Sequence, residues 1–158
     1  MDGIDTEILT LMQQDGRITN AEIARRVGMV PSATLDRIRK LESAGIIQGY
    51  QVMIDPQALG LSVTAFIFVD ADESSTDWAV AEELAEIPEV QEVHYIAGED
   101  CYLTKVRATD TEALGHLVRD RIGAIEGVTS TRTSIVMTTI KETSVLPLNG
   151  QSEEDDSG

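Results

Sequence analysis

Two short helical segments separated by a glycine turn constrain this chain more than any other feature of its sequence. Thr19 and Glu22 have the spacing of a capping box, in which the Ser or Thr side chain caps a helix that begins at the next residue. Gly28 suits the left-handed end of that helix, and Pro31 suits the first position of the following one. Together with an earlier helix from Ile4 to Gln14, this pattern predicts a helix-turn-helix.

The second helix of such a pair lies in the major groove of DNA, with its N-terminal part against the bases. Leu35, Ile38 and Leu41 recur along one face and are expected to point into the core. The opposite face then offers small polar groups near its start and cations further along, which suit bases and phosphates respectively. The predicted DNA-binding residues on the two helices are Thr19, Asn20, Arg25, Ser32, Ala33, Asp36, Arg37, Arg39 and Lys40.

Two residues count against this interpretation and keep an ordinary solvated helix face as the alternative. Val30 occupies the N-cap position, where Ser, Thr, Asp or Asn is favoured. Asp36 places an acid on the face expected to meet DNA. A carboxylate can accept a hydrogen bond from a cytosine amino group, so Asp36 does not exclude DNA binding.

The net charge has the wrong sign for a protein that binds nucleic acid. The 158 residues include 28 acids and 12 bases, for a formal net charge of −16. The charge is uneven, because residues 1–50 sum to −1 and residues 51–158 to −15. An acid-rich surface with few Lys resembles proteins of salt-loving organisms, where ions screen the self-repulsion, so we expect a halophilic protein. The alternative is a mesophilic protein with a solubilising acidic surface.

Several features indicate a cytoplasmic protein without membrane contact. No run of 18 or more apolar residues is present, and the stretch from Met1 to Asp5 is acidic where a signal peptide requires basic residues. The single cysteine, Cys101, cannot form an intrachain disulfide, which agrees with a reducing compartment.

The second half of the chain alternates strands and helices in the order βαββαβ. The expected strands are 63–69, 90–96, 101–108 and 128–140, and the expected helices are 76–87 and 111–125. This order predicts an α+β, ferredoxin-like domain, in which two helices cover one face of an antiparallel sheet. The sheet of a second copy would cover the other face, so we expect a homodimer.

These patterns divide the chain into four segments. We expect a winged-type helix-turn-helix domain at 1–48, a hinge strand and linker at 49–61, and the ferredoxin-like domain at 62–142. Residues 143–158 form an acidic tail that is expected to be disordered. Domains of this size bury little core, which also favours association between copies.

The sequence resembles the Lrp/AsnC (leucine-responsive, feast/famine) family of transcription regulators from about residue 3 to residue 141. The matching segments include Asp15-Gly16-Arg17, Ala21-Glu22-Ile23-Ala24, Ala44-Gly45-Ile46-Ile47, Pro88-Glu89-Val90, Tyr102-Leu103 and Gly127-Val128-Thr129-Ser130-Thr131-Arg132-Thr133. The resemblance implies that the second domain is a ligand-sensing domain of the RAM or ACT-like kind. It also implies a homodimer that assembles to a tetramer or octamer on double-stranded DNA, and an amino acid or related metabolite bound between subunits.

By the same resemblance, the effector site lies at one turn and on the last strand. The implied effector-binding residues are Gly98, Asp100, Tyr102, Thr131, Thr133 and Ser134. An acid can hold an ammonium group, and hydroxyls can hold a carboxylate. Many family members carry Gly-x-x-Asp-Tyr at this turn, whereas here Cys101 takes the acid position and Asp100 comes one residue early. The alternative is that the threonines and the tyrosine are ordinary strand residues.

Siroheme decarboxylases, which resemble these regulators in both domains, provide an enzyme as the main alternative. Such an enzyme needs histidine and cationic groups around a tetrapyrrole, and His94 has no Arg nearby in the sequence. The spacing of His94, His116 and Cys101 does not fit a zinc site, and the sequence lacks a nucleophile or phosphate-loop motif. We therefore predict no enzymatic activity, cofactor or metal. A third alternative is an effector-independent oligomer that organises DNA.

Overall fold

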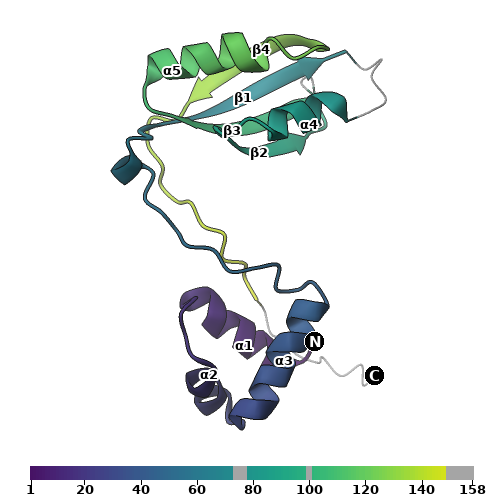
Figure 1. Ribbon diagram of the computed structural model, residues 1–158, viewed down its shortest axis with the longest axis vertical. Helices are drawn as coiled ribbons and strands as arrows, with labels where there is room; N and C mark the ends of the chain where they lie inside the picture. Colours follow the sequence, from purple (N-terminus) through teal and green to yellow (C-terminus); the bar gives the residue numbers. More distant parts are fainter. Residues whose placement is uncertain (73–77, 99–100, 149–158) are drawn as a thin grey trace, which may run out of the picture. The chain divides into compact units, whose positions relative to one another are not determined.

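The computed structural model describes residues 1–72, 78–98 and 101–148, which form two compact units (Figure 1). The first unit contains residues 1–53 together with the chain from residue 142, and the second unit contains residues 54–141. The described helices are all too short or too polar to cross a membrane. Residues 143–148, expected to begin a disordered tail, are thus grouped with the N-terminal helices, and the rest of that predicted tail lies outside the described residues.

The first unit consists of three helices, α1 (Gly3–Gln14), α2 (Asn20–Val27) and α3 (Pro31–Ser43). Their buried core contains Ile8, Leu9, Ile23, Ile38 and Leu41. Gly28 ends α2 in the left-handed conformation, with φ +70°, as the sequence predicts. Because neighbouring residues determine where these helices begin and end, the helix ends predicted from the sequence lie close to those in the structure.

The N-cap of α1 is Asp2, and Asp5 is its partner in a capping box. In α3, Leu35 is 37% exposed, and the prediction that it faces the core is wrong. Thr34 is fully buried in its place and donates a hydrogen bond to the Val30 carbonyl at 3.2 Å. The buried stripe therefore begins one residue earlier.

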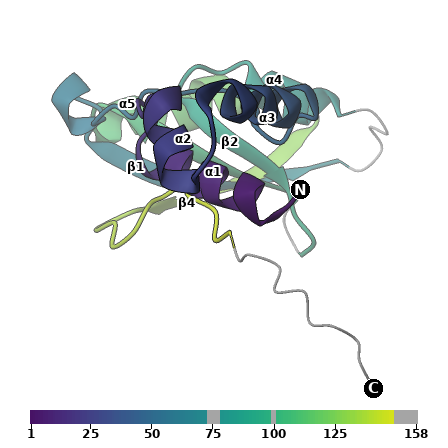
Figure 2. The same ribbon diagram turned by 90° about the horizontal axis from the view of Figure 1, so that it is seen from below.

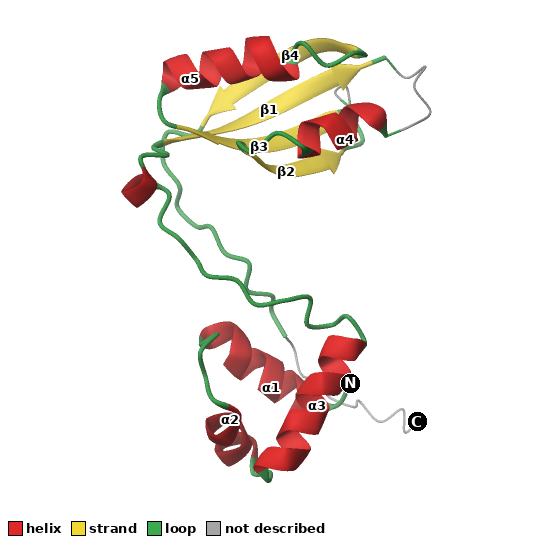
Figure 3. Ribbon diagram, viewed as in Figure 1, coloured by secondary structure: helices red, strands yellow, loops and turns green. Residues whose placement is uncertain are grey.

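The second unit follows the predicted βαββαβ order. Its elements are β1 (Val63–Ala71), α4 (Ala79–Ala85), β2 (Val90–Tyr95), β3 (Tyr102–Ala108), α5 (Thr111–His116) with a π-helical continuation (Leu117–Ile122), and β4 (Val128–Ile135). The sheet has the strand order β2-β3-β1-β4 with antiparallel pairs, which confirms the ferredoxin-like arrangement. Figures 2 and 3 show α4 and α5 on the same side of this sheet.

The core of the second unit lies between these helices and the sheet. Its buried side chains from the helices and the residues just after them are Val80, Leu84, Ile87, Leu114, Leu117, Ile122 and Ile125. Ile67 and Val69 of β1 and Val106 of β3 face them and are fully buried. Complete burial of such a side chain stabilises a fold by roughly 1.5–3 kcal/mol.

The opposite face of the sheet carries apolar side chains that are only half-buried. They are Phe66, Phe68 and Leu103. The Arg132 guanidinium lies 3.9 Å from the centre of the Phe68 ring, a cation–π contact on the same face. Because both described helices of this unit lie on the other side, the open face retains an apolar centre.

Two segments that were expected to be strands are not. Residues 49–61 contain only a 3₁₀ turn, Gln57–Leu59, and β4 ends at Ile135 instead of reaching Ile140. A strand needs a neighbour for its backbone N–H and C=O groups. Within the described residues of this single chain, the segments 49–54 and 137–141 have no strand to pair with.

Candidate DNA-binding face and effector site

The predicted recognition helix, α3, presents its DNA-binding candidates on one side of the first unit. Four of them line a pocket of about 540 Å³ that reaches the start of α1: Ala33, Asp36, Arg37 and Lys40. Ser32 and Arg39 are exposed on the same helix. Ile38 points into the core, and Leu41 is buried in the core but also lines this pocket. The candidate DNA-binding face of α3 therefore adjoins its buried face at Leu41.

Arg37 is held by the first helix rather than presented freely on that face. Its Nη1 lies 2.8 Å from Asp2 Oδ2 and 2.7 Å from Asp5 Oδ1, and its side chain is 29% exposed. The backbone hydrogen bond from Asp5, and then the guanidinium of Arg37, lower the pKa of the Asp2 carboxyl. Arg37 thus ties α3 to the capping box of α1, a contact that sequence reasoning missed.

Thr19 and Asn20 form hydrogen bonds that stabilise the helix pair. Thr19 Oγ1 accepts a hydrogen bond from the Glu22 backbone N–H at 3.2 Å and so caps α2. The Asn20 side-chain amide donates to the Pro31 carbonyl at 2.8 Å, which joins the start of α2 to the start of α3. Both residues were expected at DNA, and in this structure the Thr19 side chain caps α2 while the Asn20 side chain joins α2 to α3.

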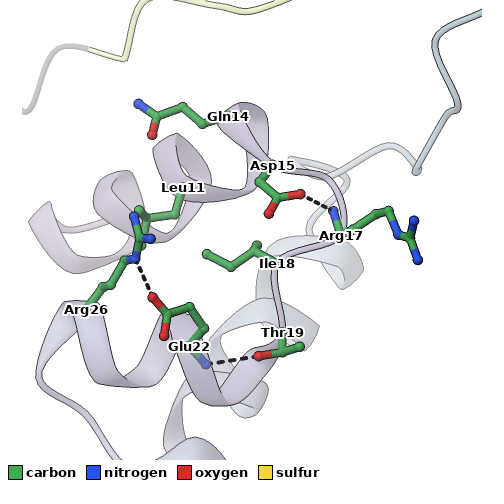
Figure 4. Close-up of a pocket in the computed structure, with 8 residues that line it drawn as sticks. All are labelled: Leu11, Gln14, Asp15, Arg17, Ile18, Thr19, Glu22 and Arg26. Carbon is green, nitrogen blue, oxygen red and sulfur yellow. Dashed lines mark hydrogen bonds and ion pairs between the residues drawn. The ribbon is translucent and has the colours of Figure 1, made fainter.

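Arg25 forms an ion pair with Glu22, which together with Arg26 lines a pocket of about 290 Å³ between α1 and α2 (Figure 4). Its Nη2 lies 2.6 Å from Glu22 Oε1, and Arg26 Nε lies 2.8 Å from the same oxygen. Hydrogen bonds from Arg25 and then Arg26 lower the pKa of Glu22 to about 2. Because its carboxylate is bound to both arginines, Glu22 does not return to the Thr19 backbone, and only half of the predicted capping box forms.

Three cations of the first unit have no ion pair with any described residue: Arg17, Arg39 and Lys40. Figure 4 shows the Arg17 guanidinium pointing away from Asp15 and Glu22. Arg39 and Lys40 are adjacent and exposed on α3. These three side chains can neutralise phosphates without first breaking an ion pair to another described residue.

The second unit places three of the effector-site candidates on one face of its sheet. Tyr102 of β3 pairs with Val69 of β1, and Val69 pairs with Thr131 of β4. Thr133 pairs with Ile67 in the same way. Opposite residues of antiparallel strands point to the same face, which here is the helix-covered one. Thr133 is exposed there, Thr131 is half-buried and Tyr102 is buried.

The remaining effector candidates are placed differently. Ser134 pairs with Phe66, so its side chain lies on the open face and is not brought together with the threonines. Gly98 lies in the turn between β2 and β3, which is closed by a hydrogen bond from the Ile96 N–H to the Cys101 carbonyl at 3.0 Å. Asp100 lies outside the described residues.

An aromatic cluster beside the Gly98 turn was not anticipated from the sequence. The Trp78 ring meets the Tyr95 ring edge to face at 5.3 Å, and Tyr95 meets Tyr102 at 5.6 Å. Trp78 is the only tryptophan of the chain and is 56% exposed. Its fluorescence can therefore report changes near Tyr102. The pairing of Tyr95 with Tyr102 across the hairpin of β2 and β3 brings these two rings together, and Trp78 contacts them from the N-cap of α4.

The histidines that an enzyme or metal site would need are engaged with acids at the surface. His94 Nε2 lies 3.3 Å from Glu92 Oε2, and His116 Nδ1 lies 2.8 Å from Asp120 Oδ2. In the described part of the chain, no three His, Cys, Asp or Glu side chains come together as metal ligands.

A helix-turn-helix unit joined to a ferredoxin-like sensing fold defines a class of two-domain transcription regulators. Residues 1–48 match the family of winged helix-turn-helix DNA-binding domains, and residues 64–146 match the Lrp/AsnC ligand binding domain. The chain belongs to the Lrp/AsnC family and is a DNA-binding transcription regulator.

Several transcription regulators are similar to this protein in sequence or structure over nearly the whole chain. The leucine-responsive regulatory proteins of Escherichia coli K12 and Salmonella typhimurium are 36% identical over 150 residues, covering 92% of this chain and 90% of theirs. A Neisseria meningitidis transcriptional regulator in complex with L-Met aligns with a TM-score of 0.90 at 35% identity, covering 94% of this chain and 97% of that one. The feast or famine regulatory protein of M. tuberculosis complexed with L-methionine has a TM-score of 0.86 at 33% identity, with 94% and 99% covered.

Proposed function

We propose that this protein regulates transcription in response to an amino acid or related metabolite bound by its second unit. The observation that carries the proposal is that the strand register puts Tyr102, Thr131 and Thr133 on one face of the sheet. Two similar structures are complexes with L-methionine, which supports an amino acid as the effector. In this proposal the protein acts in the cytoplasm. Residues 1–48 bind DNA, residues 49–61 connect the two domains, and residues 62–142 bind the effector and associate with other copies of the chain. The proposal requires no cofactor, metal or enzymatic step.

A valine at position 133 tests the effector site. Thr133→Val keeps the size of the side chain and removes only its hydroxyl, so it should abolish an amino-acid-induced rise in melting temperature. A ligand at 100 times its Kd stabilises the folded state by about 2.7 kcal/mol, which is a measurable shift. A screen of the twenty amino acids by thermal shift, with Trp78 fluorescence as a second readout, identifies the effector.

Ser134→Ala is the matched control for this experiment. It also removes a strand hydroxyl, but from the open face of the sheet, and it should leave the shift intact. An unaltered shift in Thr133→Val would place the pocket elsewhere.

Base recognition by α3 can be separated from its structural contacts. Ser32→Ala and Asp36→Ala should each change which bases are preferred, because a good base contact contributes about 1–3 kcal/mol of discrimination. Arg37→Ala should instead lower the melting temperature and weaken binding to all sequences alike, because Arg37 holds α3 against Asp2 and Asp5. Selection from a randomised duplex library measures the preferences. If Ser32→Ala and Asp36→Ala both retain the wild-type preference, α3 is not the recognition helix.

Apolar side chains on the connecting segments support self-association, which we propose produces a homodimer and then a tetramer or octamer. Val52, Met53, Met137 and Ile140 are 84% to 92% exposed. Monomeric proteins rarely leave so many large apolar side chains in water, and such patches mark interaction surfaces. The open face of the sheet, with Phe66 and Phe68, is a second surface of this kind.

The acidic surface predicts that salt stabilises the protein, as we propose for a halophilic chain. Residues 51–158 have a net charge of −15, and these charges repel one another when unscreened. The melting temperature should therefore rise as KCl increases from about 0.1 M towards multimolar concentration. Calorimetry of the purified protein across this range is the measurement, and a falling melting temperature would contradict a halophilic origin of the charge.

A further inference from the structure

The first unit is built from two pieces that are far apart in the sequence. Gln13, near the end of α1, forms two hydrogen bonds with the backbone of Leu146: its Nε2 donates to the Leu146 carbonyl at 3.1 Å, and its Oε1 accepts from the Leu146 N–H at 2.8 Å. A side-chain amide thus pairs with the returning chain as a strand would. In Figure 1 the yellow end of the described chain reaches α1.

Apolar packing accompanies these hydrogen bonds. Leu148 is half-buried and packs against the core cluster of the first unit, which contains Ile8 and Leu9 of α1. We call residues 142–148 the strap. Because it makes paired backbone contacts and adds to the core, the strap is a component of the first unit and not a loose extension.

The strap gives the first unit a second covalent connection. The chain passes from the first unit to the second after Met53 and returns after Lys141. The returning part follows β4, the strand that carries Thr131 and Thr133. A unit held by two connections has less orientational freedom than a unit held by one, and less ordering entropy is lost when it binds in a fixed orientation.

We infer that the strap is required for tight binding to paired DNA half-sites and that Gln13 is the positioning residue that seats it. The inference rests on the proposed function, in which the helix-turn-helix units of one oligomer bind DNA together. Engaging two half-sites at once depends on the effective concentration of the second unit, which falls when its tether is looser. Engaging a single half-site does not depend on it.

The test compares Gln13→Ala with Gln14→Ala in the full chain. Gln14 is the exposed neighbour on α1 and has no hydrogen bond to the strap, so it is a matched control. Hydrogen exchange should show the Leu146 amide protected in wild type and in Gln14→Ala. In Gln13→Ala the protection should fall about fivefold to tenfold, as for loss of a typical hydrogen bond.

The affinity for DNA distinguishes a positioning role of Gln13 from a merely stabilising one, because a merely stabilising contact would not change the difference between duplexes with one and two half-sites. Gln13→Ala should weaken binding to a duplex with two half-sites about tenfold while binding to a single half-site stays within about twofold. Equal losses on both duplexes, no loss on either, or an unprotected Leu146 amide in wild type would overturn the inference. If the wild-type protein bound no DNA, the proposed function would fail, and the exchange measurement would still decide whether the strap is seated.

Discussion

Replacing Arg39 and Lys40 together by glutamine is expected to lower the affinity for any DNA duplex about 50-fold at 0.1 M salt. Both cations are exposed on α3 and have no ion pair with a described residue. Each phosphate contact contributes about 0.9 to the slope of log affinity against log salt, so the slope should fall by nearly two. Titrations between about 0.05 and 0.3 M salt, on specific and random duplexes, measure both quantities.

Arg26→Gln is the control for this double substitution. It removes one cation from the same unit, but Arg26 is already paired with Glu22 at 2.8 Å. Its effect on affinity and on the salt slope should therefore be smaller than the effect of replacing Arg39 alone or Lys40 alone by glutamine. If the slope of log affinity against log salt did not change in the variant with both Arg39 and Lys40 replaced, these two residues would not contact DNA phosphates.

The sequence predicted the helices of the first unit well because their ends depend on neighbouring residues. Thr19, Gly28 and Pro31 act within one turn of the position they define. The buried stripe of α3 was predicted one residue late. Thr34 and Leu35 are both compatible with helical spacing, and only packing against α1 and α2 decides which of them is buried.

The candidate DNA-binding face was harder to predict because its arginines have distant partners. Arg37 is separated by 35 residues from Asp2 and by 32 from Asp5, and no periodicity connects them. Helical periodicity in a sequence shows that an arginine lies on an outward face. It does not show with which carboxylate that arginine forms an ion pair. Arg39 and Lys40 were identified in the same way, and neither forms an ion pair with another residue that the structure describes.

In the second unit, strand order was predictable and side-chain direction on the last strand was not. The sequence predicted β1 and β3 as strands, and in the structure alternate residues of each strand are buried. On β4 the sequence Thr131 to Ser134 is polar throughout, so nothing in it distinguishes the two faces. The pairing of Ser134 with Phe66 decides the matter, and this register is a tertiary property.

Replacing Phe68 by lysine is expected to dissociate the proposed dimer, raising its dissociation constant about 1000-fold. Phe68 lies near the centre of the open sheet face, half-buried within one chain, so the monomer can accommodate the lysine in water. In a dimer that covers this face the new ammonium would be buried next to the guanidinium of Arg132, its cross-strand neighbour, and the two like charges would repel each other. Burying a further charge beside a like charge costs several kcal/mol. Sedimentation equilibrium measures the constant.

Ala85→Lys is the control, because it adds the same charge on α4, on the helix-covered side of the sheet, at an exposed position. It should leave the dimer intact, and circular dichroism should show that both variants keep their secondary structure. If Phe68→Lys remained a dimer with the wild-type dissociation constant, the open face would not be the dimer interface. The exposed apolar side chains of the connecting segments, led by Met137 and Ile140, would then be the surface on which two copies meet.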